Sequence, residues 1–415
     1  MLLGRLFSQI VESGDLTVID ATGRVHRFGD GRPPRATMRL HDKALHVRLA
    51  LNPRLALGEA YMDGTLTVDE GSLHDLLSIL SANIQRYEAL PMTRLGEAVG
   101  MAFRGLQQRN PIGRAQANVA HHYDLSDDLY ELFLDGDRQY SCAYFNSPYD
   151  TLETAQCNKK RHIAAKLLLD RSDLRVLDIG SGWGGLGLYL SQQADAKVTG
   201  VTLSTEQHKY SQDQVARLAI AGRTEFRLRD YRLETGPYDR IVSVGMFEHV
   251  GAARYKEYFS KISEMLTDDG VALVHTIGRS SPPGQTNSWI RKYIFPGGYT
   301  PALSEIVAAV EKTDLIITDV EILRLHYAQT LRHWLDRFQS GRYELRKIYD
   351  ERFCRMWEFY LVSAEISFRH LGQVVFQIQL AKRQDAVPLT RDYIAQWEAE
   401  VTAVGQAAAV GQAAD

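Results

Sequence analysis

The chain has 415 residues, of which 45% are hydrophobic and 24% charged, a composition that excludes a disordered or collagen-like protein. Its formal net charge of −3 argues against a general nucleic-acid binder, because such proteins are usually strongly basic. The length suits two or three domains, and the three cysteines are too few for a disulfide framework, so we expect a reducing, cytoplasmic compartment.

From the first residues of the sequence we expect no signal peptide. The opening residues, MLLGRLFSQIVESGD, lack the uninterrupted apolar core of a signal peptide. No segment offers about 18 uncharged apolar residues, so we expect no transmembrane helix.

Residues 1–54 carry nine basic and five acidic residues, a local charge of +4. This stretch either faces anionic phospholipid or is an ordinary solvated surface.

Periodic patterns predict the first elements. Alternating apolar residues indicate short strands at 17–20 and 44–49, and leucines on one helical face indicate a helix over 72–84. Glycine and proline then place a linker near residues 105–118. We therefore expect an accessory domain over 1–115, a second domain over 116–400, and a disordered low-complexity tail over 401–415.

Strand-like and helix-like patterns alternate from about residue 155 to 320, which predicts an α/β fold, a doubly wound parallel sheet. The expected strands are 175–179, 197–201, 225–228, 240–244, 271–276 and 316–321, with 374–380 as a late candidate. The expected helices are 154–169, one that begins at Ser204, 255–266 and 303–313, followed by helical patterns over 329–371. In such a sheet, ligands lie beyond the carboxyl ends of the strands.

A glycine loop follows the first of these strands. In DIGSGWGGLG, the glycines Gly180, Gly182 and Gly185 fit the G-x-G-x-x-G pattern of dinucleotide-binding loops. Three features argue against a nicotinamide dinucleotide: a carboxylate, Asp178, inside the strand end, no acidic residue after the second strand, and bulky Trp183 where the phosphates would pass. The loop suits S-adenosylmethionine better, because a carboxylate at the strand end can face an ammonium group.

On this interpretation, residues at the ends of successive strands contact different parts of the cofactor. The expected contacts are Asp178 with the 180–184 backbone for the methionine part, Thr202 and Gln207 for the ribose, and Asp230 for the adenine amino group. Ser204 begins the capping box STEQ, and helix capping alone explains that serine. Capping does not explain a polar Gln207 toward the edge of the sheet.

Acidic and imidazole side chains follow the next two strands. Glu248 and His249 lie just past the fourth strand and His275 ends the fifth, so they should meet the glycine loop at one edge of the sheet. A single histidine there is usually a core residue, but a glutamate and a histidine on neighbouring strand ends favour catalysis. Cys142 has no base nearby in the sequence, so we expect an inert thiol. No Cys/His spacing predicts a metal site.

Ordered motifs then point to a family. They include YSCAYF, LETAQCNKKRHIAAKL, VLDIGSGWGGL, GVTLSTEQ, YDRIVSVGMFEHVG, KYIFPGGYTP and YDERFCRMWEFYL between about 118 and 380, with LGEAYMDG at 57–64. Together they closely resemble the cyclopropane-fatty-acyl-phospholipid synthases, kin of the mycolic acid cyclopropane synthases. The resemblance implies a class I S-adenosylmethionine methyltransferase fold, a Rossmann-like sheet with a helical lid, and a smaller N-terminal domain that assists lipid engagement.

The resemblance also implies an activity. The family adds the methyl carbon of S-adenosylmethionine across a cis double bond of a phospholipid acyl chain, which suggests peripheral binding at the inner face of the cytoplasmic membrane. A bicarbonate ion beside the reacting carbon would be held by the backbones of Cys142 and Ile277 and the side chains of Glu248, His275 and Tyr327. Family cofactor contacts add Tyr140, Ser141, Ser204 and Tyr231. Relatives suggest a homodimer, and no nucleic-acid partner is expected.

Departures from the family are few. Ser181 stands where many members have cysteine, at a position where only the backbone is expected to contact the cofactor. Ala364 stands where some members have a cysteine once considered catalytic, which excludes a thiol mechanism there. Tyr144 and Phe247 are candidates for stabilising a carbocation, although packing explains Phe247 equally well.

Three other functions remain open from the sequence. If the carbocation loses a different proton, the product is a methyl-branched unsaturated chain without a ring. A dinucleotide-dependent oxidoreductase is disfavoured by the missing acid after the second strand. A non-catalytic lipid-binding protein is disfavoured by the intact set of Glu248, His275 and Tyr327.

Overall fold

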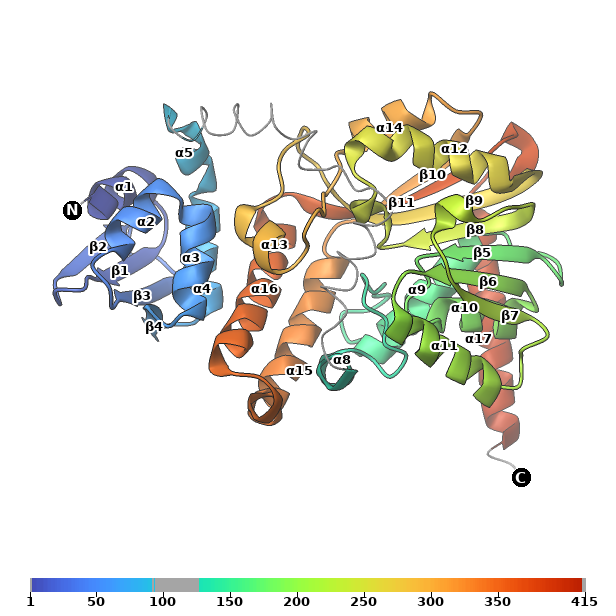
Figure 1. The fold of residues 1–415 in the computed structure, drawn as a ribbon, viewed down its shortest axis with the longest axis horizontal. Coiled ribbons are helices and arrows are strands. Elements are labelled where there is room, and N and C mark those ends of the chain that lie inside the picture. The colour runs from blue at the N-terminus through green and yellow to red at the C-terminus, as the bar shows by residue number, and fades with distance from the viewer. Residues whose placement is uncertain (1, 92, 94–126, 413–415) are drawn as a thin grey trace. The chain divides into compact units, whose positions relative to one another are not determined.

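The computed structural model describes residues 2–91, 93 and 127–412, so the linker expected near 105–118 lies outside the described residues. The chain forms two compact units (Figure 1). The N-terminal unit takes in residues 1–108, 284–298 and 327–373, and the sheet unit takes in 109–283, 299–326 and 374–415. The domain bounds expected from the sequence run continuously along the chain, whereas these units interleave.

The N-terminal unit contains a four-stranded sheet in the order β2-β1-β3-β4. β1 pairs antiparallel with β2 and parallel with β3, and β3 pairs antiparallel with β4. Its elements are α1 (Leu2–Ile10), β1 (Asp15–Ile19), β2 (Val25–Gly29), β3 (Arg35–Leu40), α2 (Leu45–Leu51), α3 (Pro53–Met62), β4 (Leu66–Glu70), α4 (Leu73–Ala82) and α5 (Ile84–Ala89), with α13 (Ser288–Tyr293), α15 (His326–Ile348) and α16 (Glu351–His370) from later in the chain. The strand expected at 17–20 is confirmed as β1.

The strand expected at 44–49 is wrong, because this segment forms helix α2. Leu45 and Leu49 are buried, while Val47 between them is 51% exposed. Residues four apart share one face of a helix, whereas a strand would place all three side chains on the same face. The apparent alternation in the sequence was therefore a helical pair of leucines with an exposed valine between them.

The leucine-rich helix expected at 72–84 is confirmed as α4. Its start is closed by a capping box in which Ser72 and Asp75 exchange side-chain and backbone hydrogen bonds. Leu76 at its centre is fully buried in the apolar core of the N-terminal unit. This face of α4 is therefore a core surface, and it is not available to dock on lipid.

The sheet unit is built around seven strands in the order β10-β11-β9-β8-β5-β6-β7. Its elements are α8 (Asp127–Phe133), α9 (Leu152–Lys166), β5 (Arg175–Ile179), α10 (Gly185–Ala194), β6 (Lys197–Thr202), α11 (Thr205–Arg217), β7 (Thr224–Leu228), β8 (Tyr238–Val244), α12 (Tyr255–Met265), β9 (Leu266–Arg279), α14 (Leu303–Val310), β10 (Ile316–Leu323), β11 (Gln373–Ala381) and α17 (Asp392–Gln412), with short 3-10 turns that include η1 (Tyr231–Leu233) and η2 (Phe247–His249). Every helix and strand expected between 154 and 380 is present. The sheet is mixed, because β10 and β11 pair antiparallel, so the expectation of a wholly parallel sheet is wrong at that edge.

The central strands lie between two layers of helices, with α12 and α14 on one face and α9, α10 and α17 on the other (Figure 1). Alternate side chains of these strands pack against different layers. Leu177 packs in the core cluster that includes residues of α12 and α14, whereas Val176 packs with residues of α9 and α10. Asp178 has the parity of Val176, and His275 has the parity of Leu273, which belongs to the same cluster as Val176. The strand pattern therefore turns both functional side chains toward the α9 layer.

Helix α17 closes the sheet unit and packs against α9. It continues to Gln412, through the segment from residue 401 for which we expected disorder. Across the described parts of the chain, no helix is both long and apolar enough to cross a membrane.

Candidate active site

The glycine loop connects β5 to α10 and needs glycine for two different reasons. Gly180 has a φ of +81°, and a Cβ there would lie 2.8 Å from the Cβ of Met246. Gly184 has a φ of +90° and forms the N-cap of α10. The backbone N–H groups of Gly180 and Ser181 both donate to the carbonyl of Val201, at 2.9 and 3.0 Å. The loop is therefore held by its backbone against the end of β6.

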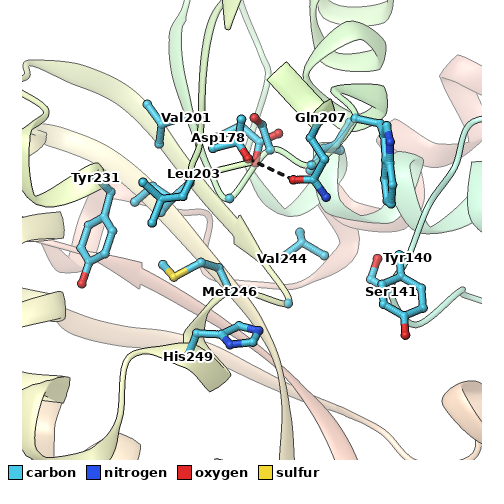
Figure 2. A pocket seen from close by; sticks show the side chains of 18 of the residues that line it. Tyr140, Ser141, Asp178, Val201, Leu203, Gln207, Tyr231, Val244, Met246 and His249 are labelled. Carbon is cyan, nitrogen blue, oxygen red and sulfur yellow. Dashed lines mark hydrogen bonds between the residues drawn. The ribbon is translucent and has the colours of Figure 1, made fainter. Parts of the chain in front are cut away.

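A pocket opens at the carboxyl ends of β5, β6 and β8 (Figure 2). Every predicted cofactor residue except Ser204 lines it: Tyr140, Ser141, Asp178, Gly180, Gly182, Thr202, Gln207, Asp230 and Tyr231. Figure 2 shows Tyr231 and Tyr140 on opposite sides, with Met246 and His249 between them. Burial lowers the pKa of His249 to about 4, so its ring is neutral. Ser204 instead caps α11, where its hydroxyl accepts from the backbone N–H of Gln207.

Asp178 is the strongest electrostatic feature of this pocket. Its side chain is buried at the end of β5, and Oδ2 has no hydrogen-bond partner among the described residues. Burial raises the pKa of Asp178 to about 7, and the positive charge of Lys159 opposes that rise. A buried carboxylate oxygen with no partner has a strong preference for a cationic ligand group.

The residues expected at the ribose end already bond to each other. The hydroxyl of Thr202 donates to Oε1 of Gln207 at 3.0 Å and accepts from the backbone N–H of Ser204 at 3.2 Å. All three residues are buried. Thr202, at the carboxyl end of β6, thus orients the side chain of Gln207. This contact accounts for the polar residue that capping did not explain.

Asp230 has a partner that the sequence did not reveal. Its carboxylate accepts from the backbone N–H of Arg232 at 3.0 Å and from the guanidinium Nε and Nη2 at 2.8 and 2.6 Å. Burial would raise the pKa of Asp230, but these bonds from Arg232 lower it. The carboxylate is therefore firmly ionised and fixed, which suits an acceptor for an adenine amino group.

Two buried polar residues on α9 hold the wall that contains Tyr140 and Ser141. Lys159 donates to Oε1 of Gln139 at 2.7 Å and to the hydroxyl of Ser141 at 2.8 Å. One turn earlier, Gln156 donates to the backbone carbonyls of Gln139 and Ser141, at 3.1 and 3.0 Å. The segment 139–141 has no regular structure of its own, so this pair defines its path.

Sequence reasoning missed Gln156 and Lys159 as functional residues. Both lie within the motif LETAQCNKKRHIAAKL, but polar residues in an amphipathic helix are normally assigned to its solvated face. Both side chains are fully buried here, and burial lowers the pKa of Lys159 to about 8. The only available signal was their i, i+3 spacing, which places them on one helical face.

Glu248 lies in η2, directly after β8, and its two carboxyl oxygens have different surroundings. Oε1 accepts from the backbone N–H of Ile277 at 2.6 Å, while Oε2 is buried with no partner among the described residues. The backbone carbonyl of Glu248 also accepts from Tyr299 at 2.9 Å. Burial raises the pKa of Glu248 to about 7, so both protonation states are accessible near neutrality.

His275 lies inside β9, which continues to Arg279, so the expectation that this histidine ends its strand is wrong. Its partner in the sheet is Val244, the last residue of β8, so His275 is level with the carboxyl end of that strand. Its Nδ1 lies 3.1 Å from the side-chain nitrogen of Gln377, which donates. The proton of the neutral ring is therefore on Nε2, a buried donor with no partner among the described residues. Burial lowers the pKa of His275 to about 3, so the ring is neutral.

The remaining predicted residues are placed as follows. Cys142 is buried in the sheet unit, and its thiol donates to the carbonyl of Ala143 at 3.3 Å. Tyr327 belongs to the N-terminal unit, where its ring packs against Trp334 and Phe368. Its position beside Glu248 thus stays a prediction from the family resemblance.

The two candidates for carbocation stabilisation do not have free rings. Tyr144 stacks with His162 at 4.2 Å and with His326 at 4.8 Å between ring centroids. Phe247 is fully buried and stacks on Tyr255 at 4.4 Å. The structure therefore assigns Phe247 to packing, and Tyr144 to a stack of aromatic and imidazole rings.

Separately, no group of three or more His, Cys, Asp or Glu suited to a metal ion occurs in the described residues.

The chain is similar to several proteins of known function. Residues 112–378 match the family of mycolic acid cyclopropane synthetases, and residues 3–87 match a domain of unknown function. The cyclopropane-fatty-acyl-phospholipid synthase of Escherichia coli (strain K12) is 37% identical over 345 residues, which cover 82% of this chain and 87% of that protein. The tuberculostearic acid methyltransferase UfaA1 of Mycobacterium tuberculosis is 33% identical over 395 residues, covering 92% of this chain and 91% of that protein.

A solved structure adds information on the ligand. Mycolic acid cyclopropane synthase CmaA1, complexed with SAH and CTAB, matches with a TM-score of 0.61 and 34% identity, over 66% of this chain and 99% of that chain. That protein binds the product form of S-adenosylmethionine on the same fold. The pocket at the ends of β5, β6 and β8 is thus the site to consider for the cofactor.

Proposed function

This chain belongs to the mycolic acid cyclopropane synthetase family, and from that membership we propose that it cyclopropanates cis double bonds in phospholipid acyl chains. Membership alone makes it a fatty acid methyltransferase or cyclopropane synthase that uses S-adenosylmethionine. One observation carries the finer proposal: Glu248, in the turn after β8, and His275, on the adjacent strand β9, each present a buried polar atom that no described residue satisfies. Such a pair suits a small ligand at the reacting centre.

The residues of the pocket fit S-adenosylmethionine. The unsatisfied Oδ2 of Asp178 would face the ammonium group of the methionine part. Tyr140 and Ser141 would line the same end, the Thr202–Gln207 pair would serve the ribose, and Asp230 with Tyr231 would hold the adenine. When bound, the sulfonium supplies an electrophilic methyl group, and the chain's task is to aim it at the alkene.

Glu248, which follows β8, and His275, which lies in β9, fit a bicarbonate ion. The neutral ring of His275 offers its Nε2–H, and Glu248 offers Oε2, which is a donor when protonated. Because the N–H of Ile277 already donates to Glu248, its part is to orient that carboxyl group. The family resemblance adds the backbone of Cys142 and the side chain of Tyr327. When bound, the ion supplies a base for the proton that the added methyl group must lose.

The reaction first creates a positive charge on the acyl chain and then removes a proton from it. Attack of the alkene on the sulfonium methyl group would form the new C–C bond and break the S–CH3 bond, so that S-adenosylhomocysteine leaves and a positive charge stays on the acyl chain. A neighbouring anion would lower the energy of that state. Glu248 can hold such an anion when protonated, because its raised pKa keeps the carboxyl from repelling it. Loss of a proton from the added methyl group then closes the ring.

A second product is favoured by the names of the relatives. UfaA1, similar over nine-tenths of this chain, is named a methyltransferase rather than a cyclopropane synthase. If a neighbouring carbon loses the proton instead, the product is a methyl-branched unsaturated chain. The position of the base relative to the added methyl group separates the two outcomes.

The test is incubation of the protein with labelled S-adenosylmethionine and vesicles of cis-unsaturated phospholipid. Mass spectrometry should show acyl chains heavier by one CH2 unit, and proton NMR should show the high-field methylene of a cyclopropane. Gain of mass with new vinyl or methyl signals instead would establish the branched product. Absence of labelled lipid, with cofactor binding intact, would reject both.

A second experiment tests the ion. Turnover is measured in carbonate-free buffer under inert gas, with and without added bicarbonate, after the ion has been shown to be absent from the purified protein. We expect activity to depend on the added ion. Equal rates would reject the ion mechanism and make Glu248 itself the candidate base.

We also propose that the protein acts on a bilayer as a peripheral, cytoplasmic enzyme. Charge attraction by residues 1–54 is weaker than their net charge suggests, because Arg39 and Arg48 are paired with Asp69 and Glu59, which lie outside that stretch. Exposed apolar side chains at Val47 and Leu51 of α2 offer a second contribution. Vesicle sedimentation should show binding that rises with anionic lipid and weakens with salt. Sedimentation equilibrium tests the homodimer suggested by relatives.

A further inference from the structure

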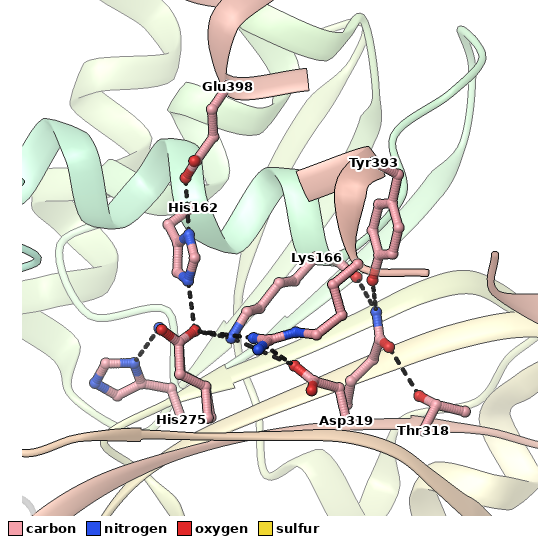
Figure 3. A network of polar contacts seen from close by, with 11 residues as sticks. His162, Lys166, His275, Thr318, Asp319, Tyr393 and Glu398 are labelled. Carbon is pink, nitrogen blue, oxygen red and sulfur yellow. Dashed lines mark hydrogen bonds and ion pairs between the residues drawn. The ribbon is translucent and has the colours of Figure 1, made fainter. Parts of the chain in front are cut away.

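A buried histidine on α9 joins three elements of the sheet unit (Figure 3). Nε2 of His162 lies 2.7 Å from Oε2 of Glu321 on β10, and Nδ1 lies 2.7 Å from Oε1 of Glu398 on α17. A carboxylate only accepts hydrogen bonds, so two such contacts require a proton on each ring nitrogen. The geometry therefore defines His162 as an imidazolium.

Charged and titratable groups face this ring from every element packed against it. They are Glu321 on β10, Glu398 on α17, Lys166 on α9 itself, Tyr144 in the segment before α9, and His326 at the start of α15. Asp319 and Arg391 complete the network through an ion pair of 3.2 Å. Burial and Lys166 lower the pKa of His162, but the bonds to the two glutamates outweigh them and raise it.

The imidazolium also supports an aromatic stack. Its ring lies 4.2 Å from the ring of Tyr144 with an interplanar angle of 16°, and Tyr144 stacks on His326 at 4.8 Å and 10°. A cation against an aromatic face is attracted by the π electrons. The backbone N–H of the next residue, Phe145, donates to Nδ1 of His326 at 3.0 Å. The segment 142–145 is thus held at two points: the ring of Tyr144 in the stack and the backbone N–H of Phe145.

We propose that His162 is a positioning residue for lipid alkylation, held as an imidazolium by Glu321 and Glu398 and acting through Tyr144. Tyr144 is two residues from Cys142, and His326 directly precedes Tyr327 in the chain, so the stack orders both segments that carry proposed ligands of the ion. The inference rests on the proposed function. It gives a role to α17, which lies beyond the matched residues 112–378.

The protonation state of His162 makes this role depend on pH. Because its folded-state pKa lies above the ordinary value, the imidazolium is fully formed below that ordinary value and is lost as the pH rises through the raised one. Loss of the proton breaks one carboxylate bond and removes the cation from the stack. Turnover should therefore decline on the alkaline side with the titration of His162.

The decisive experiment compares pH profiles of kcat on cis-unsaturated phospholipid vesicles for the full-length wild type and two matched variants. Glu398→Gln removes one of the two carboxylates and should move the alkaline decline to lower pH. Glu400→Gln changes an exposed residue one half-turn along the same helix and should leave it in place. Superimposable profiles for wild type and both variants would overturn the proposal.

A second pair of variants keeps the test independent of folding at position 162. Tyr144→Phe retains the ring but loses the hydroxyl that faces Glu321, so it should lower kcat only slightly. Tyr144→Leu removes the stack and should lower kcat by roughly 10- to 100-fold, the cost expected of a misplaced group. The affinity of both for S-adenosylmethionine, measured by calorimetry, should match that of the wild type. Equal kcat in the two would refute the role of the stack. If the wild type itself labels no lipid, the proposed function fails, and this inference fails with it.

Discussion

Asp178 and Glu248 are buried carboxyl groups at the ends of two paired strands, β5 and β8, and burial raises the pKa of each to about 7. Their neighbours differ. The charge of Lys159 favours the anionic form of Asp178, whereas Glu248 receives a backbone bond from Ile277 and no charged side chain of the described residues contributes. Asp178 is thus suited to bind a cation, and Glu248 to hold an anion or a proton. The surroundings of each carboxyl group, rather than its chemical type, determine its role.

The largest expected effect comes from Glu248→Gln, which tests the anion side of this comparison. The amide still accepts from Ile277, but it cannot titrate, and it orients a bound base differently. We expect turnover to fall by about 10²- to 10⁴-fold, the contribution of general-base catalysis. Transfer of labelled methyl groups to lipid measures it.

The control for that variant is Glu264→Gln, on the exposed side of α12, which should leave turnover unchanged. Calorimetry should show normal affinity of Glu248→Gln for S-adenosylmethionine. A matching loss of affinity would mean that Glu248 belongs to the cofactor side, and the division of roles would collapse.

The next effect in size is Asp178→Asn, on the cation side. A charged hydrogen bond contributes about 1.5–3 kcal/mol, so the affinity for S-adenosylmethionine should weaken by roughly 10- to 100-fold. Calorimetry against both S-adenosylmethionine and NAD measures this, and NAD should show no comparable binding to the wild type. Unchanged affinity of the variant for S-adenosylmethionine would remove Asp178 from the cofactor site.

Lys159→Met sharpens the comparison, because it removes the positive charge that Asp178 has beside it and Glu248 lacks. Ionised Asp178 binds the ammonium group, so wild-type affinity should rise with pH through about 7. Without the positive charge of Lys159, the pKa of Asp178 is higher, and the midpoint should move to higher pH. Cofactor affinity measured across pH shows this, with the exposed Lys209→Met as the control. An unmoved midpoint would restrict Lys159 to holding Gln139 and Ser141.

These predictions draw unequally on sequence and structure. Asp178, Glu248 and His275 follow from the sequence, because carboxyl ends of parallel strands meet at one edge whatever the loops do. Lys159 and Arg232 do not, because a polar residue in a helix or turn carries no mark of which buried group it will meet. His162 shows the limit most clearly, since its partner Glu398 is 236 residues away in the sequence and no motif connects the two.

The errors in the fold have a similar origin. The parallel centre of the sheet follows from alternating strand and helix patterns, but the antiparallel pairing of β10 with β11 depends on how the chain returns after two long helices. At α2, six residues with leucines at 45 and 49 are compatible with both periods. Only the exposed Val47 distinguishes them, and exposure is a property of the fold.

The smallest expected effect is Ser181→Cys, which restores the residue common in the family and asks whether the cofactor loop acts through its backbone. The N–H of Ser181 donates to Val201 and its carbonyl accepts from Gly184, bonds that a change of side chain leaves intact. The hydroxyl is buried without a partner among the described residues, a state that costs about 1–3 kcal/mol for a polar group. A thiol behaves as a small apolar group, so it relieves part of that cost. We expect an unchanged affinity for S-adenosylmethionine and a Tm a few degrees higher by calorimetry, since about 1 kcal/mol shifts the Tm of a domain this size by roughly 2–4 °C. A loss of affinity would show that the serine hydroxyl contacts the cofactor, and Asp178 would then share the cation side with a side chain of the loop.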